Sequence, residues 1–123
     1  MGDFAVKCTD YRKIEGKDID HPEVKDVNMR VVIGEDDGAP NFVMRVFTVK
    51  PGGHTPWHTH PYEHELFFHA GSGAVRYGDN AETDITPVGP GTVAYVAPDE
   101  IHQIRNTGTE DLVFVCLIPK GVV

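Results

Sequence analysis

Histidines are concentrated in one short stretch of this 123-residue chain. The segment HTPWHTHPYEHE, from His54 to Glu65, holds four of the seven histidines. Side chains two apart on a strand point to the same face, so His58 and His60 are expected side by side. Two imidazoles arranged in this way can bind one transition-metal ion between them. This spacing therefore suggests a metal site.

Two further histidines are predicted to point in the same direction. His64 begins an apolar run and shares a face with Leu66 and Phe68. Phe67 on the opposite face is also apolar, so alternation leaves open which face is buried. His102 shares a face with Ile104. A buried imidazole is costly unless its nitrogens are satisfied, and one metal ion satisfies several at once. We therefore predict a metal site formed by His58, His60, His64 and His102.

Glu65 is the alternative to His64 as fourth ligand. A carboxylate would lower the effective charge of a divalent ion by one, whereas four neutral imidazoles leave the ion a stronger Lewis acid. If His64 is the ligand, Glu65 either orients an imidazole N–H or is an ordinary exposed carboxylate. The sequence identifies no catalytic acid, base or nucleophile, so the catalytic residues stay unknown at this point.

The elements that must position these residues are short strands separated by turns rich in Gly, Pro, Asn and Asp. No stretch keeps a helical period beyond about two turns, so an antiparallel sandwich or barrel is expected. Residues 29–123 are predicted to form the barrel, and residues 1–28 an arm that packs on it or on a partner subunit. The predicted strands are Met29–Ile33, Asn41–Val49, His64–Ala70, Ala74–Gly78, Thr92–Ala97, His102–Asn106 and Leu112–Ile118.

The composition narrows the class of partner. A formal net charge of −8 argues against binding to nucleic acid or to an anionic membrane surface. No apolar run reaches the roughly 18 residues needed to span a membrane, and no secretory signal is visible at the N-terminus. Cys8 and Cys116 form no disulfide framework and are expected to be reduced. We expect a cytoplasmic protein that binds a small molecule.

The histidine segment resembles the first motif of the cupin superfamily. That motif reads G-x5-H-x-H-x3-E-x6-G, and Gly52, His58, His60 and Gly71 match it in spacing. Position 64 holds His where the motif has Glu. A longer form of the motif has four residues between the second His and the Glu, and it would use Glu65 instead. Gly71 would then stand one residue before the position of the closing Gly.

A second cupin motif, G-x5-P-x-G-x2-H-x3-N, is matched by Gly91, His102 and Asn106. Ala97 stands at the Pro position and Asp99 at the Gly position. Since Asp tolerates the turn conformations that Gly favours, this change affects the loop more than the fold. The resemblance covers residues 29–120, and it is closest to small bacterial single-domain cupins with an all-histidine site.

The resemblance implies an all-β cupin double-stranded β-helix, a jelly-roll barrel that is often dimeric, with a metal inside one mouth. One divalent transition metal per chain is expected at His58, His60, His64 and His102. The resemblance puts Mn first and Fe second, and imidazole ligands also suit Zn, Ni, Co and Cu.

Four ligands in an octahedral sphere leave two positions, which suits oxidation of a small oxygen-bearing molecule by O2. We therefore expect a metal-dependent oxidoreductase of dioxygenase or oxidase type. The alternatives are a non-catalytic metal- or sugar-binding barrel and a metal-dependent isomerase. The apolar faces of residues 41–49 and 112–118 favour a homodimer. Arg45 and Arg76 could anchor an anion at the mouth, although the barrel exterior is the expected place for both.

Overall fold

The computed structural model describes residues 6–79 and 83–122, and within these ranges no residue lies in an α-helix. Two 3-10 helices, η1 (Tyr11–Lys13) and η2 (Glu35–Asp37), are too short to cross a membrane. The predicted all-β class is confirmed. The strands of the described residues are β1 (Lys17–Asp18), β2 (Lys25–Ile33), β3 (Phe42–His54), β4 (His64–Ala70), β5 (Gly73–Tyr77), β6 (Ile85–Val88), β7 (Val93–Val96), β8 (His102–Asn106) and β9 (Leu112–Pro119).

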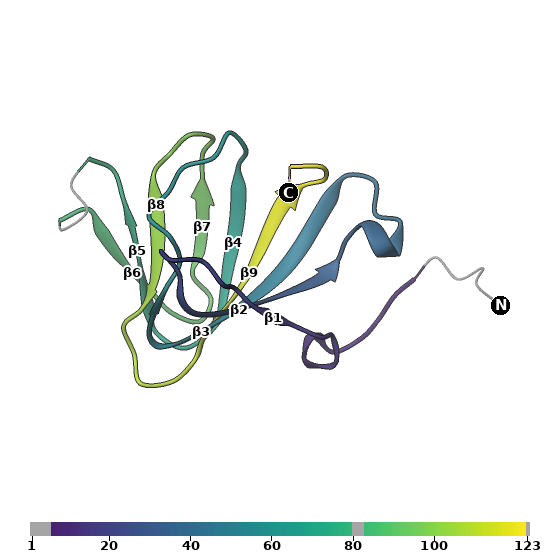
Figure 1. Ribbon diagram of the computed structural model, residues 1–123, viewed down its shortest axis with the longest axis horizontal. Helices are drawn as coiled ribbons and strands as arrows, with labels where there is room; N and C mark the ends of the chain where they lie inside the picture. Colours follow the sequence, from purple (N-terminus) through teal and green to yellow (C-terminus); the bar gives the residue numbers. More distant parts are fainter. Residues whose placement is uncertain (1–5, 80–82, 123) are drawn as a thin grey trace.

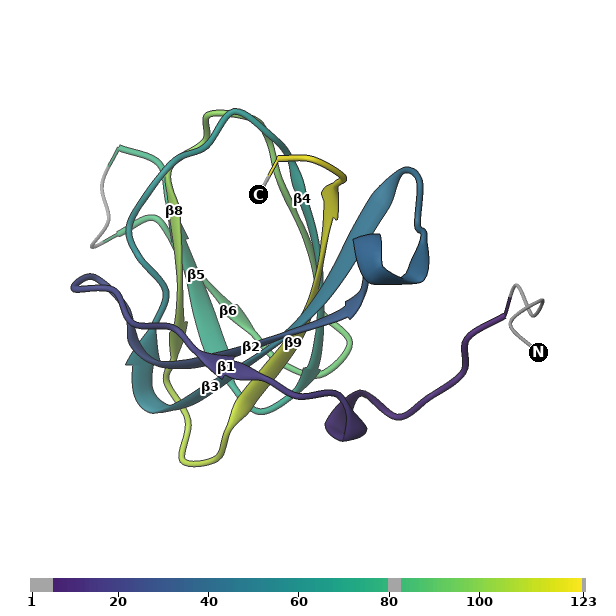
Figure 2. The same cartoon turned by 45° about the vertical axis from the view of Figure 1, so that its right-hand side comes forward.

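The strands form one antiparallel sheet that curls into a barrel. Seven of them are hydrogen-bonded in the order β6-β5-β8-β3-β9-β4-β7, and β2 pairs with β1 and β3. Figure 2 shows β5, β6 and β8 on one side and β4 and β9 on the other, with β1 to β3 crossing at the base. The long strand β3 connects the two sides, because residues 42–49 pair with β9 while His54 pairs with Arg105 on β8.

The core fills the space between the two sides of the barrel. Phe47 and Phe114 stack with ring centroids 5.1 Å apart, and Phe68 packs on Phe114 at 5.3 Å. Phe68 and Phe114 are buried completely or nearly so. These rings come from the neighbouring strands β3, β9 and β4, and burial of one such side chain contributes about 1.5–3 kcal/mol to holding these strands around the core.

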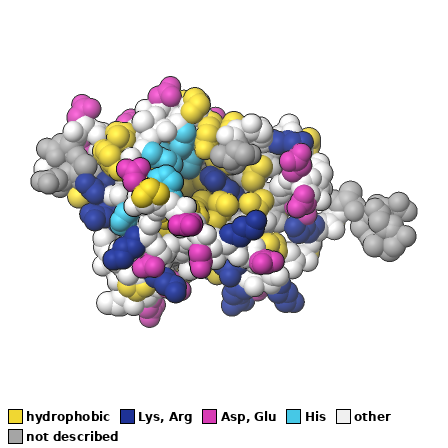
Figure 3. All heavy atoms as spheres, in the orientation of Figure 1, with side chains coloured by type: hydrophobic (Ala, Val, Ile, Leu, Met, Phe, Trp, Pro, Cys, Tyr) yellow, Lys and Arg dark blue, Asp and Glu magenta, His cyan; other side chains and the backbone are white. Residues whose placement is uncertain are grey.

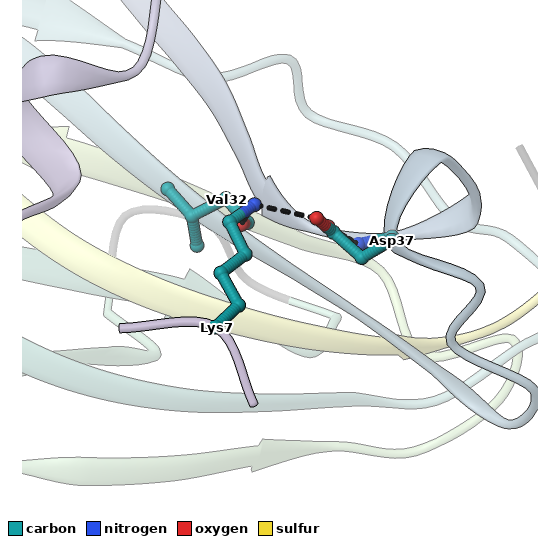
Figure 4. Close-up of polar contacts among 4 residues, drawn as sticks. Lys7, Val32 and Asp37 are labelled. Atoms are coloured by element: carbon teal, nitrogen blue, oxygen red, sulfur yellow. Dashed lines mark hydrogen bonds and ion pairs between the residues drawn. The ribbon is translucent and has the colours of Figure 1, made fainter. Parts of the chain in front are cut away.

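The described part of the N-terminal segment runs across the barrel (Figure 1). Tyr11 and Ile14 pack on the outer face of the sheet, whereas Ile19 and Val24 pack against the inner core. Lys7 Nζ donates to the Val32 carbonyl oxygen at 2.8 Å and pairs with Asp37 at 2.7 Å, as Figure 4 shows. Strand β2 begins at Lys25 and so extends across the boundary that the sequence placed after residue 28.

Two strands were not predicted from the sequence. β1 is only two residues long, and β6 contains Pro87, which cannot donate a ladder hydrogen bond. β6 lies at one end of the strand order, where such a residue is tolerated. Short edge strands of this kind depend on their neighbour, and their own residues give little signal.

Candidate metal centre

His58 and His60 lie in the connection between β3 and β4, and not on a strand as the sequence analysis expected. Pro56 and Pro61 interrupt this connection, and proline has no backbone N–H for strand pairing. His58 instead forms an isolated antiparallel bridge with His102 on β8. The His58 N–H donates to the His102 oxygen at 3.2 Å, and the His102 N–H donates back at 3.0 Å. This bridge brings two imidazoles together from distant parts of the sequence.

Three imidazoles form a compact group, and their ligand nitrogens lie within 4.8 Å of one another. They belong to His58, His60 and His102. The ring centroids of His58 and His102 and those of His60 and His102 are both 5.0 Å apart. This group could hold a metal ion.

Backbone carbonyl oxygens set the tautomer of two of these rings. His60 Nδ1 lies 2.7 Å from the Tyr62 oxygen, and His102 Nδ1 lies 2.9 Å from the Glu100 oxygen. A carbonyl only accepts, so each Nδ1 carries the hydrogen and each Nε2 keeps its lone pair. The Nε2 of His60 is buried with no hydrogen-bond partner among the described residues. A metal ligand with one nitrogen held by a carbonyl typically has this arrangement, so the residues fit a metal.

Three of the four histidines that the sequence predicts as ligands form the compact group, and His64 lies beside it. The His64 ring stacks on His60 at 4.2 Å and lies 5.3 Å from His102. Its Nδ1 is 3.3 Å from the Cys116 sulfur, and its Nε2 is buried without a partner among the described residues. His64 therefore belongs to the same pocket but not to the compact group.

Burial favours the neutral form of His58, His64 and His102. It is the main cause that lowers the pKa of His58 to about 4 and that of His64 to about 3, and neighbouring histidines lower both further. Burial also lowers the pKa of His102, against an opposing hydrogen bond to Glu100. Neutral imidazoles are the form that binds a metal, so these rings are ready to act as ligands at neutral pH.

Glu65 lies on the other face of β4, as strand alternation requires. Its side chain borders a different surface hollow, together with Glu63, Phe42 and Leu117. A hydrogen bond with Glu63, followed by burial, raises the pKa of Glu65 to about 7. The structure therefore offers no support for Glu65 as the fourth ligand or as a partner of a ligand imidazole.

The histidines line a cavity of about 290 Å³ inside the barrel. Figure 3 shows the histidine side chains gathered beside hydrophobic side chains, with a cationic side chain among them. The described lining residues include no Asp or Glu. The apolar part of the wall includes Ile19, Val24, Met29, Phe47, Ile104 and Phe114.

Other polar residues of the cavity wall include His21, Arg45 and Cys116. His21 reaches it from the N-terminal segment. Arg45 was expected on the exterior but is only 8% exposed and lines the cavity. Its Nη2 lies 3.2 Å from the sulfur of Cys116, a buried free thiol whose pKa is raised mainly by burial. Arg45 shares the inward face of β3 with Phe47 and Val49, so strand alternation was a usable signal.

The other motif residues support the loops around the site. The Asn106 amide donates to the oxygens of Val49 at 2.8 Å and Glu110 at 2.7 Å, and its oxygen accepts from Gly108. Asp99 adopts a left-handed φ of 66°, as expected for a residue in place of Gly, and its N–H donates to the His60 oxygen. Asp99 thereby ties the histidine loop to the turn that precedes His102.

Comparison with known proteins gives a family and a fold. The family described as "Cupin domain" matches residues 45–118. The polyketide cyclase RemF from Streptomyces resistomycificus is similar in structure, with a TM-score of 0.84 and 28% identity over 93% of this chain and 79% of that chain. A protein from Thermotoga maritima described as a predicted oxalate decarboxylase has a TM-score of 0.79 and 21% identity over 93% of this chain and 99% of its own. The latter likeness shows the fold alone.

A curated relative matches over a shorter segment. A glucose-6-phosphate isomerase from Thermococcus kodakarensis is 33% identical over 65 residues, which cover 51% of this chain and 34% of the isomerase. The match therefore spans about a third of that relative. The enzymes named in these comparisons are a cyclase, a decarboxylase and an isomerase.

Proposed function

Because the chain belongs to the cupin domain family, we propose that it is a metal-dependent enzyme that activates a carbonyl-bearing small molecule. The observation that carries this proposal is the group of three imidazoles facing a cavity without any Asp or Glu among its described lining residues. Neutral ligands leave the full charge on a divalent ion, which favours Lewis-acid chemistry over the support of high oxidation states.

His64 is proposed as a fourth ligand beside His58, His60 and His102. Its buried Nε2 has no partner among the described residues, and its ring lies parallel to that of His60, at an interplanar angle of 10°. A buried imidazole nitrogen without a partner is destabilising, and coordination would remove that cost. Manganese and then iron remain the ions that the sequence resemblance predicts, and metal analysis decides between them and the other divalent ions.

When bound, the metal would polarise a substrate carbonyl and stabilise negative charge on its oxygen. The protein's own groups orient and shield this site. Hydrogen bonds to the Tyr62 and Glu100 oxygens hold the rings of His60 and His102. The apolar wall around Phe47 and Phe114 binds the hydrocarbon part of a substrate and excludes water.

Isomerisation or cyclisation is the reaction class that this arrangement supports best. Both begin from a polarised carbonyl and need no net oxidation. The cyclase and isomerase among the similar proteins are consistent with this class. The oxidoreductase predicted from the sequence stays a competing hypothesis, and it differs because turnover would consume O2.

Metal content and O2 uptake together test the proposal. Untagged wild-type protein, purified without added metal or chelator, is compared with His64→Ala and with His69→Ala as a control on the outer face. We expect about one transition metal per chain in the wild type and the control, and weakened binding in His64→Ala.

The metal-loaded protein is then incubated with a panel of small diketones, keto acids and hydroxy aldehydes in a sealed oxygen-electrode cell. Product formed without O2 uptake supports Lewis-acid catalysis, whereas stoichiometric O2 uptake supports the oxidoreductase. A ligand that raises the melting temperature but is recovered unchanged supports a binding protein. A wild type that binds no metal, even when metal is added, contradicts the proposal.

The homodimer expected from the sequence stays a prediction. The outer face of β4 and β7 exposes apolar side chains that a second copy would cover, with Phe67 48%, Val93 72% and Tyr95 64% exposed. Exposed apolar patches of this kind often mark interaction surfaces. Light scattering that gives the 13.6 kDa mass of one chain would contradict the dimer.

A further inference from the structure

Arg45 is a buried cation without an anionic partner among the described residues. The residue is 8% exposed, and its Nε has no hydrogen-bond partner in the part of the chain that the structure describes. Its other contacts are with sulfur atoms, at 3.2 Å from Cys116 and 3.9 Å from Met29, and with the ring of Phe47 at 5.0 Å from the centroid. Sulfur is a weak acceptor, so the guanidinium is poorly compensated.

The rest of the cavity does not balance this charge. Its described lining residues include no Asp or Glu. A buried charge is destabilising unless it is paired, and such exceptions to the rules of stability are expected at functional sites. A metal at the histidines would add further positive charge to the same cavity. The missing partner is therefore expected to be negatively charged and to come from outside the protein.

We propose that Arg45 forms an anion-binding subsite beside the histidines, and that the cavity takes a small, largely apolar organic acid. The planar guanidinium fork matches a carboxylate, and the apolar wall accepts the hydrocarbon part of the same molecule. The inference deepens the proposed function and rests on it only in treating this anion as the enzyme's substrate. In that case Arg45 would hold the carboxylate while another oxygen of the substrate faces the metal.

The test compares a charged probe with its neutral analogue. Dissociation constants for benzoate and benzamide are measured by calorimetry on the full chain after treatment with chelator, so that metal cannot attract the carboxylate. The variants are Arg45→Met, Arg45→Lys and Arg105→Met. Arg105 is exposed on β8 and is absent from the cavity lining, so the last variant controls for net charge.

We expect the wild type and Arg105→Met to bind benzoate about tenfold more tightly than benzamide, which corresponds to about 1.4 kcal/mol. Arg45→Met should lose this preference, and Arg45→Lys should keep only part of it because an ammonium lacks the fork. Arg45→Met should also melt at a higher temperature than the wild type in the absence of ligand, because it removes an unpaired buried charge.

Equal affinity for the two probes in the wild type, or a benzoate preference that survives in Arg45→Met, would overturn the subsite. So would a large loss of melting temperature in Arg45→Met, since it would make Arg45 a structural residue. Metal analysis of the same wild-type preparation separates the two proposals. A benzoate preference without any metal binding would sustain the subsite and contradict the proposed function. Metal binding without a benzoate preference would contradict the subsite and leave the proposed function standing.

Discussion

Two of the hollows of the barrel differ in character, one on the outer face of the sheet and one inside. The outer groove, beside the N-terminal segment, has a volume of about 580 Å³, and the histidine cavity has about 290 Å³. Charged groups along the outer groove are paired, since Lys7 lies 2.7 Å from Asp37 and Arg12 lies 2.6 Å from Asp10. The inner cavity instead holds buried nitrogens that have no hydrogen-bond partner within residues 6–79 and 83–122, on His60, His64 and Arg45.

The comparison shows that the presence or absence of hydrogen-bond and ion-pair partners for the polar atoms is a better guide to function than the volume of the hollow. Exposed ion pairs contribute little and need no ligand. Buried nitrogens without partners carry a free-energy cost that a metal or an anion would remove. The smaller hollow is therefore the candidate site, and the contrast can be tested by matched changes in both places.

The largest expected contrast is in metal binding. His102→Ala removes a ring of the compact group and should weaken metal affinity by about 100-fold or more, because even residues that only support a ligand cost 10–100-fold. His69→Ala, on the outer face beside Tyr11, should leave the affinity unchanged. Titration with a competing chelator measures both. Equal losses in the two variants would show that the inner cavity has no special role.

The second contrast is in stability. Phe114→Ala should lower the free energy of unfolding by about 3–5 kcal/mol, because it leaves a cavity between the two sides of the barrel. Val115→Ala, on the outer face of the same strand, should cost about 1 kcal/mol, since this site is only partly buried. Urea unfolding of the two variants measures the difference. Similar losses would mean that the outer face is as tightly packed as the core.

The third contrast concerns pH. The pKa values of His58 and His64 are lowered to about 4 and about 3 from an ordinary value of 6.5. Below pH 6.5 the unfolded chain takes up protons that the folded chain resists. The free energy of unfolding of the metal-free protein should therefore fall as pH drops from 6.5 to about 4.

Urea unfolding at a series of pH values measures this slope. His64→Ala should reduce it, and His69→Ala serves as the control on the outer face. A slope that is the same in wild type and His64→Ala would show that the buried imidazole does not resist protonation.

The smallest expected effect is on the outer groove itself. Lys7→Ala removes the ion pair with Asp37 and the hydrogen bond to the Val32 oxygen, both made by a lysine side chain that is 41% exposed (Figure 4). The melting temperature should stay within the error of the measurement. A clear drop would show that this paired surface contributes more to the fold than exposed ion pairs usually do.

Much of the fold was readable from local patterns. Alternation located β4 and most of β9, because each has a buried face with apolar side chains at every second residue. Turn residues around it located β8. β6 was missed because Pro87 obscures it. The contacts of Glu65 and the inward placement of Arg45 were harder to predict. They depend on which face of a strand other elements of the fold cover, and local patterns do not show this.

The sequence alone indicated the all-β class and singled out His58, His60, His64 and His102 as candidate ligands, because turn residues and motif spacing are local properties of the chain. Only the tertiary structure decided that His58 reaches His102 through a bridge from a loop, and that three imidazoles group closely while His64 stands beside them. It alone also placed Arg45 in the same cavity. These outcomes depend on distances between residues far apart in sequence, and such distances are set by how the two sides of the barrel pack against each other.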